Sequence, residues 1–125
     1  MALNFDEAPE FQKDVKILKK SWRSIPSDIE NAKLVIARLY VPIKGVDMDE
    51  FRNGIFSSTR ATILHSSDTG EVVKMRLDCK SLGDDKKTRL IFIAIWTENT
   101  IKLIELYAKN SNEREDMRRI KKYLS

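Results

Sequence analysis

Two apolar segments separated by a short turn place the strongest constraint on how this sequence can fold. Residues Arg89–Thr97 (RLIFIAIWT) are apolar at consecutive positions, which is typical of a central strand buried on both faces. Glu98 and Asn99 suit a tight turn, and Ile101–Ala108 predicts another largely buried strand. The chain is therefore expected to fold around a sheet with these two strands in its interior.

The preceding segment, Glu71–Lys80 (EVVKMRLDCK), alternates in character and predicts a strand with two different faces. One face is apolar and suits a core, whereas the other carries Lys74, Arg76 and Lys80. These cations form either a solvated strand surface paired with acidic residues or an anion-binding surface. Residues 81–88 contain glycine and aspartate and are expected to form a hairpin loop into the next strand.

The first third of the chain predicts a short strand and a pair of helices. Residues 2–6 suit the strand. Apolar residues then recur at helical spacing over 11–22 and again over 29–39. Two adjacent amphipathic helices joined by a short turn predict an α-hairpin.

Capping residues indicate where the later helices begin. Pro26 is expected to break the first helical pattern, and Ser27 with Glu30 has the spacing of a capping box for the second helix. Ser111 or Asn112 is expected to cap a C-terminal helix. That helix is expected to turn inward Met117, Ile120 and Leu124.

Residues 43–69 show no clean period and are interpreted as a long connection that holds a strand near Ala61–His65. The resulting element order is β-α-α-(β)-β-β-β-α. We therefore expect an α+β fold in which a twisted, antiparallel-rich sheet of about four or five strands carries a helical hairpin and a C-terminal helix. Residues 1–125 are expected to form a single domain.

Composition restricts the function classes. The single cysteine, Cys79, excludes an intramolecular disulfide, and with one histidine, His65, no metal site or cofactor is expected. The acidic N-terminus lacks the apolar core of a signal peptide, and Leu90–Trp96 is too short to span a bilayer. A cytoplasmic protein without membrane attachment is expected.

The sequence lacks a glycine-rich phosphate loop and a Gly-x-Ser-x-Gly elbow. Enzymatic chemistry would therefore depend on lysine, arginine, tyrosine and carboxylates. Such a set suits cleavage of a phosphodiester in RNA, because cations stabilise the negative charge that develops on phosphorus. The neighbouring 2′-OH attacks, so no protein nucleophile is needed.

The string FDEAPEFQKDVKILKKSW, followed by KMRL, TRLIFIAI, IKLIELYAKNSNE and RRIKKYL, resembles the RelE/ParE superfamily of toxins from toxin–antitoxin systems. The resemblance covers nearly the whole chain apart from residues 43–69. It implies a RelE/ParE-like fold and a cognate antitoxin as partner. RelE-like members enter the ribosomal A site and cut mRNA there, whereas ParE-like members inhibit DNA gyrase.

For the RelE-like branch, the resemblance implies a catalytic set of four basic residues. Lys74 and Arg76 match the two basic positions of the RelE-like strand. Arg89 matches the arginine that contacts the scissile phosphate, and Lys109 matches the basic residue at the end of the last strand.

Two positions depart from the RelE-like pattern. Asn110 stands where a second catalytic arginine is expected, and Asp116 stands roughly where a proton-transferring tyrosine would lie. Proton transfer would then fall to Tyr107 or Tyr123.

A further basic group is expected either to contact RNA phosphates non-specifically or to form a solvated surface. It consists of Lys80, Arg114, Arg118 and Lys121. Three functions remain open at this point: a ribosome-dependent mRNA endonuclease that inhibits translation, a ParE-like gyrase inhibitor that is not a nuclease, and an inactive RelE-fold interaction protein.

Overall fold

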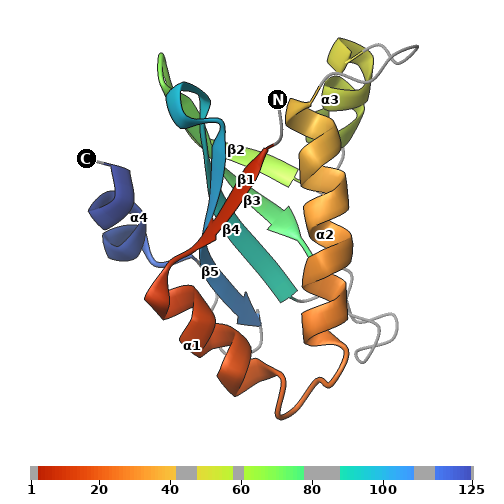
Figure 1. Ribbon diagram of the computed structural model, residues 1–125, viewed down its shortest axis with the longest axis vertical. Helices are drawn as coiled ribbons and strands as arrows, with labels where there is room; N and C mark the ends of the chain where they lie inside the picture. Colours follow the sequence, from red (N-terminus) through yellow and green to blue (C-terminus); the bar gives the residue numbers. More distant parts are fainter. Residues whose placement is uncertain (1–2, 42–47, 58–60, 78–87, 109–114, 125) are drawn as a thin grey trace.

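A five-stranded sheet in the order β1-β5-β4-β3-β2 organises the described part of the chain (Figure 1). The computed structural model describes residues 3–41, 48–57, 61–77, 88–108 and 115–124. The strands are β1 (Asn4–Glu7), β2 (Ala61–Ser67), β3 (Gly70–Arg76), β4 (Thr88–Ile95) and β5 (Thr100–Ala108). β1 runs parallel to β5, and the other neighbours are antiparallel. The predicted α+β fold is confirmed.

The two apolar segments form the interior strands β4 and β5, as predicted. Seven of the eight residues of β4 are buried. The turn between them consists of a 3-10 turn, Trp96–Glu98, followed by Asn99 in the left-handed conformation with φ 50°. Asparagine tolerates this conformation better than most residues do, which suits a reversal between two strands.

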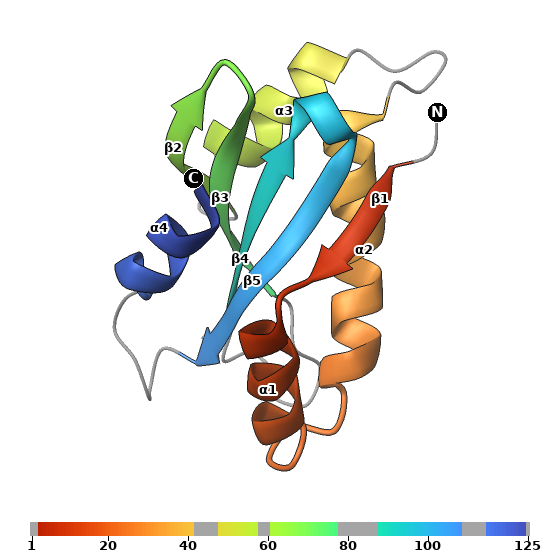
Figure 2. The same cartoon turned by 60° about the vertical axis from the view of Figure 1, so that its left-hand side comes forward.

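Helices cover both faces of the sheet (Figures 1 and 2). α2 (Ile25–Tyr40) and α3 (Met48–Ser57) lie on one side, and α4 (Met117–Leu124) lies on the other. α1 (Pro9–Leu18) continues from β1 and runs beside β5, against which it packs. No helix among the described residues is long and apolar enough to cross a membrane.

The main core lies between α2 and the apolar face of β3. Val73 and Met75 are almost fully buried, as the alternation of this strand predicted. Phe92 on β4 lies opposite Val73 and meets the ring of Tyr40 from α2 edge-on, with the ring centroids 6.2 Å apart. The opposite face of β3 therefore carries Lys74 and, at the end of the strand, Arg76.

The predicted boundary between the first two helices is wrong. α2 begins at Ile25, so that Pro26 lies within its first turn, where proline is tolerated. The Ser27–Glu30 capping box does not form. Ser24 instead precedes the helix, and its hydroxyl donates to Asp28 Oδ2 at 2.6 Å. α1 also ends at Leu18, earlier than the predicted residue 22.

The connection over residues 43–69 contains more structure than predicted. The expected strand near Ala61–His65 is present as β2, but the helix α3 was not predicted. α3 is attached to the sheet by Arg52, which donates to the buried carboxylate of Glu71 at 2.5 Å. Tyr40 donates to the other oxygen of that carboxylate at 2.6 Å.

The C-terminal helix is present, but two of its three predicted core residues are not buried. Ile120 is 1% exposed, whereas Met117 is 50% exposed and Leu124 is 40% exposed. Asp116 caps the helix by accepting hydrogen bonds from the backbone N–H groups of Arg118 at 3.0 Å and Arg119 at 3.3 Å. The predicted caps Ser111 and Asn112 lie outside the described residues.

Candidate nucleic-acid interface

A row of polar residues crosses three strands on the α4 side of the sheet. Arg76 on β3 lies opposite Arg89 on β4, and Arg89 lies opposite Tyr107 on β5. Neighbouring strands are about 5 Å apart, so these three predicted residues are adjacent. Lys74 lies two positions along β3 on the same face, opposite Ile91. The structure therefore brings together four residues that the sequence placed in one site.

Arg89 lies at the centre of this row and is only 8% exposed. Burial lowers the pKa of its guanidinium, and repulsion from Arg76 lowers it further. One guanidinium nitrogen donates to the carbonyl of Thr88 at 3.2 Å. Two arginines at directly opposed positions repel each other, and an anion bound between them would relieve that repulsion.

Tyr107 is 3% exposed, and its pKa is raised to about 12. Burial is the largest cause, and the carboxylates of Glu115 and Glu105 contribute further. The phenol is therefore protonated at neutral pH. It can donate a hydrogen bond or a proton to an anionic ligand, but it cannot act there as a base.

Glu115, which the sequence analysis did not single out, enters the same site from the segment just before α4. Its Oε2 lies 3.2 Å from the ammonium of Lys74, and its side chain is 14% exposed. It also raises the pKa of Tyr107, in part through a hydrogen bond. The predicted alternative of an acidic partner for the basic strand therefore holds for Lys74. The acid comes from a residue 41 positions away and not from a neighbouring strand.

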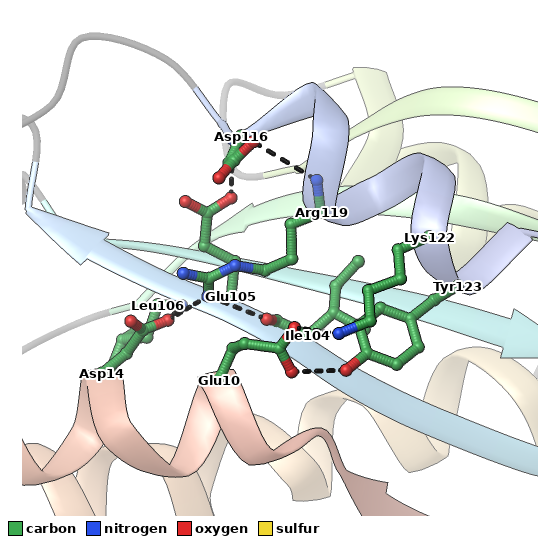
Figure 3. A network of polar contacts seen from close by, with 9 residues as sticks. All are labelled: Glu10, Asp14, Ile104, Glu105, Leu106, Asp116, Arg119, Lys122 and Tyr123. Carbon is green, nitrogen blue, oxygen red and sulfur yellow. Dashed lines mark hydrogen bonds and ion pairs between the residues drawn. The ribbon is translucent and has the colours of Figure 1, made fainter.

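The position of α4 is fixed by polar contacts to α1 and to the edge of β5 (Figure 3). Arg119 donates to Asp14 at 2.5 Å and to the carbonyl of Ile104 at 3.1 Å. Asp14 also accepts the backbone N–H of Leu106 at 3.0 Å. These contacts satisfy backbone groups of β5 beyond the point where β1 ends, and they tie the helix to the sheet.

A buried acid supports the start of α4. Glu105 on β5 is 3% exposed, and burial raises its pKa. It accepts the backbone N–H of Asp116 at 2.8 Å. Asp116 in turn serves as the helix cap, so its carboxylate is bonded to the first turn of α4.

Tyr123, the second predicted proton-transfer residue, lies away from the arginine row. Its hydroxyl donates to Glu10 of α1, which also pairs with Lys122 at 2.9 Å. The ammonium of Lys102 lies 5.0 Å from its ring centroid. Lys102 therefore marks the position of Tyr123 along β5. Tyr107, which belongs to the arginine row, lies five residues further along the strand, at a distance of roughly 16 Å. Tyr123 therefore anchors α4 to α1.

The remaining predicted residues divide into two groups. Arg118 and Lys121 lie on α4 and are exposed, as RNA-contacting residues must be. Lys80, Lys109, Asn110 and Arg114 lie outside the described residues. Within the described ranges, no group of three or more histidine, cysteine, aspartate or glutamate residues could hold a metal ion.

A hollow of about 470 Å³ lies at the far end of the face from Arg89, between the β2–β3 turn and the end of α4. His65, Ile93, Tyr123 and Leu124 are among its lining residues. His65 is exposed there.

Comparison with known proteins connects this arrangement to one fold. No protein-family model matches the sequence, and no curated protein matches it by sequence. Among solved structures, the archaeal RelE-RelB complex from Pyrococcus horikoshii OT3 is similar, with a TM-score of 0.53 and 13% sequence identity. The match covers 87% of this chain and 97% of that chain. At this identity the likeness concerns the fold, and the chain has a RelE-like fold.

Proposed function

We propose that this chain is the toxin of a toxin–antitoxin pair and that it inhibits translation by cleaving mRNA on the ribosome. The observation that supports the proposal is the row formed by Arg76, Arg89 and Tyr107, with Lys74 beside it, on a RelE-like fold. Three cations and one protonated phenol on adjacent strands suit a phosphate that gains negative charge during reaction.

In the proposed reaction, the 2′-OH of a ribose loses its proton to solvent water, its oxygen forms a bond to the adjacent phosphorus, and the bond from phosphorus to the 5′-oxygen of the next nucleotide breaks. The proton released to water balances the one that the departing 5′-oxygen takes up. The products are a 2′,3′-cyclic phosphate and a free 5′-OH. Arg89 and Arg76 would stabilise the charge on the non-bridging oxygens. Tyr107, which is protonated at neutral pH, would donate a proton to the departing oxygen.

The proposed partner is an antitoxin protein that covers the basic face. The similar solved structure is a RelE-RelB complex, so a protein with this fold is known in a two-protein assembly. An acidic or amphipathic segment would complement Arg118 and Lys121 on α4 as well as the arginine row.

Inducible expression tests the proposal directly. Growth is measured for the wild-type chain and for Arg89→Gln and Arg76→Gln, while mRNA 5′ ends are mapped on ribosomes. We expect wild-type expression to stop growth and to produce ribosome-associated cuts. Each substitution is expected to lower cleavage by about 100-fold or more, because a charge-assisted contact to the transition state is lost.

Arg23→Gln is the matched control, since Arg23 is exposed in the turn between α1 and α2. It should leave cleavage unchanged, and thermal unfolding should show that all variants are folded. Growth arrest with DNA damage and intact mRNA would instead identify a gyrase inhibitor. Unimpaired growth with an expressed, folded protein would identify an inactive interaction protein.

A further inference from the structure

The carboxylate of Glu115 lies beside two of the residues that the proposed function assigns to the substrate phosphate, Lys74 and Tyr107. It lies 3.2 Å from the ammonium of Lys74 on β3, and it contributes to the raised pKa of Tyr107 on β5. Glu115 therefore interacts with residues of two strands. A carboxylate and a phosphate accept the same charge-assisted hydrogen bonds from an ammonium group and a phenol. The two anions would therefore compete for the same donors.

The chain holds this carboxylate in place through its neighbours. Asp116, the next residue, caps α4 and is bonded through its N–H to the buried Glu105. α4 is in turn tied to α1 by the pair of Arg119 and Asp14. Because the start of α4 is anchored in this way, the Glu115 carboxylate is held close to Lys74, and its effective concentration there is high.

We propose that Glu115 is an internal competitor that occupies the phosphate position and must be displaced when RNA binds. The inference depends on the proposed RNA-cleaving function for the identity of the ligand. Displacement is feasible because Lys74 is 31% exposed and partly exposed ion pairs contribute little to stability. The predicted consequence is selectivity for polyanions. A single phosphate competes poorly with a tethered carboxylate, whereas an RNA strand can bind Arg118 and Lys121 at the same time.

The first test measures pyrophosphate binding by NMR titration of the wild type, Glu115→Gln and Glu30→Gln. Glu30 is exposed on α2 and pairs with Lys33 in its own helix, so Glu30→Gln removes the same charge away from the site. We expect Glu115→Gln to bind pyrophosphate about threefold to tenfold more tightly than either other protein. The gain should disappear in Glu115→Gln/Lys74→Gln, because the freed ammonium is then absent.

The second test uses a fluorescent single-stranded RNA whose 2′-oxygens are methylated, so that it binds but is not cleaved. Glu115→Gln should bind it more tightly and should steepen the dependence of log affinity on log salt concentration by about 0.7, the value for one additional phosphate contact. Thermal unfolding is measured for each variant, so that altered binding is compared only between folded proteins.

The two tests separate the failure of this inference from the failure of the proposed function. Equal affinities of Glu115→Gln and Glu30→Gln for both ligands would overturn the role of Glu115, even if RNA binds. Tighter pyrophosphate binding without any RNA binding would support Glu115 as an internal competitor for anions and would contradict RNA as the ligand.

Discussion

At the scale of single residues, Gly70 shows how closely two strands approach at the end of β3 that is farthest from Arg76. It opens β3 opposite Ile95, and a Cβ added there would lie 1.9 Å from the carbonyl oxygen of Ala94. Because that oxygen belongs to the backbone of a central strand, no side-chain rotation can make room. The position therefore requires glycine for close approach of two strands.

We predict opposite effects of alanine at two glycines. Gly70→Ala should lower the free energy of unfolding by about 1–3 kcal/mol, since the added methyl forces β3 and β4 apart. Gly54→Ala should raise it by about 0.5–1 kcal/mol, because Gly54 lies within α3 with nothing within 4 Å of an added Cβ. Urea denaturation measures both changes. Equal stabilities of the two variants would contradict the packing at Gly70.

The candidate site could be predicted from the sequence only where its residues share a strand pattern. Lys74 and Arg76 follow from alternation in β3, whereas Arg89 was expected in the site from the resemblance to the RelE-like pattern. Glu115 belongs to no such pattern. Its role depends on where the start of α4 packs, which brings Glu115 to a lysine 41 positions earlier.

At the scale of secondary-structure elements, strands were predicted better than helix boundaries. β4 and β5 are buried on both faces, and strands of this kind are apolar at most consecutive positions, which can be seen directly in the sequence. α3 was missed because its attachment to the sheet is long-range: Arg52 binds Glu71, which lies 19 residues away. Local periodicity does not contain that information.

The attachment of α4 to α1 predicts a response to acid. Hydrogen bonds from Tyr123 and Lys122 lower the pKa of Glu10 from 4.5 to about 2. A lowered folded pKa means that the contact stabilises the folded state above about pH 4.5 and is lost as the pH falls through about 2. Amide hydrogen exchange in α4, corrected for intrinsic rates, should therefore accelerate over that range.

Glu10→Gln should remove most of this acid response, and its α4 amides should already exchange faster than those of the wild type at neutral pH. Glu30→Gln provides the control, because Glu30 pairs with Lys33 within α2 and does not contact α4. Unchanged exchange in Glu10→Gln at neutral pH would show that the remaining contacts, Arg119 with Asp14 among them, are sufficient to hold the helix.

At the scale of the whole molecule, the two faces of the sheet are covered unequally. α2 and α3 lie over the apolar face, with α1 beside the edge of β5, whereas the short α4 is the only helix among the described residues on the other face (Figures 1 and 2). Lys74 and Arg76 consequently remain partly exposed although they belong to the interior strand β3. This asymmetry leaves two partly exposed cations on an otherwise well-packed sheet.

The formal net charge of +4 is modest, so the proposed RNA binding should depend on where the cations lie. Two double variants separate the effects of placement and total charge. Arg118→Gln/Lys121→Gln changes exposed residues of α4, and Lys13→Gln/Lys16→Gln changes exposed residues of α1. Each removes two positive charges and therefore leaves the chain with the same net charge as the other.

If α4 borders the binding face, only the α4 variant should weaken binding of the methylated RNA. The slope of log affinity against log salt concentration should become shallower by about 1.4, because two phosphate contacts of about 0.7 each are lost. The α1 variant should retain the wild-type slope, since α1 lies beside the edge of β5, whereas α4 lies over the face of the sheet that carries the arginine row. Equal weakening of RNA binding in both variants would mean that binding depends on the total charge of the protein. That result would contradict the proposal that the α4 side of the sheet is the interface.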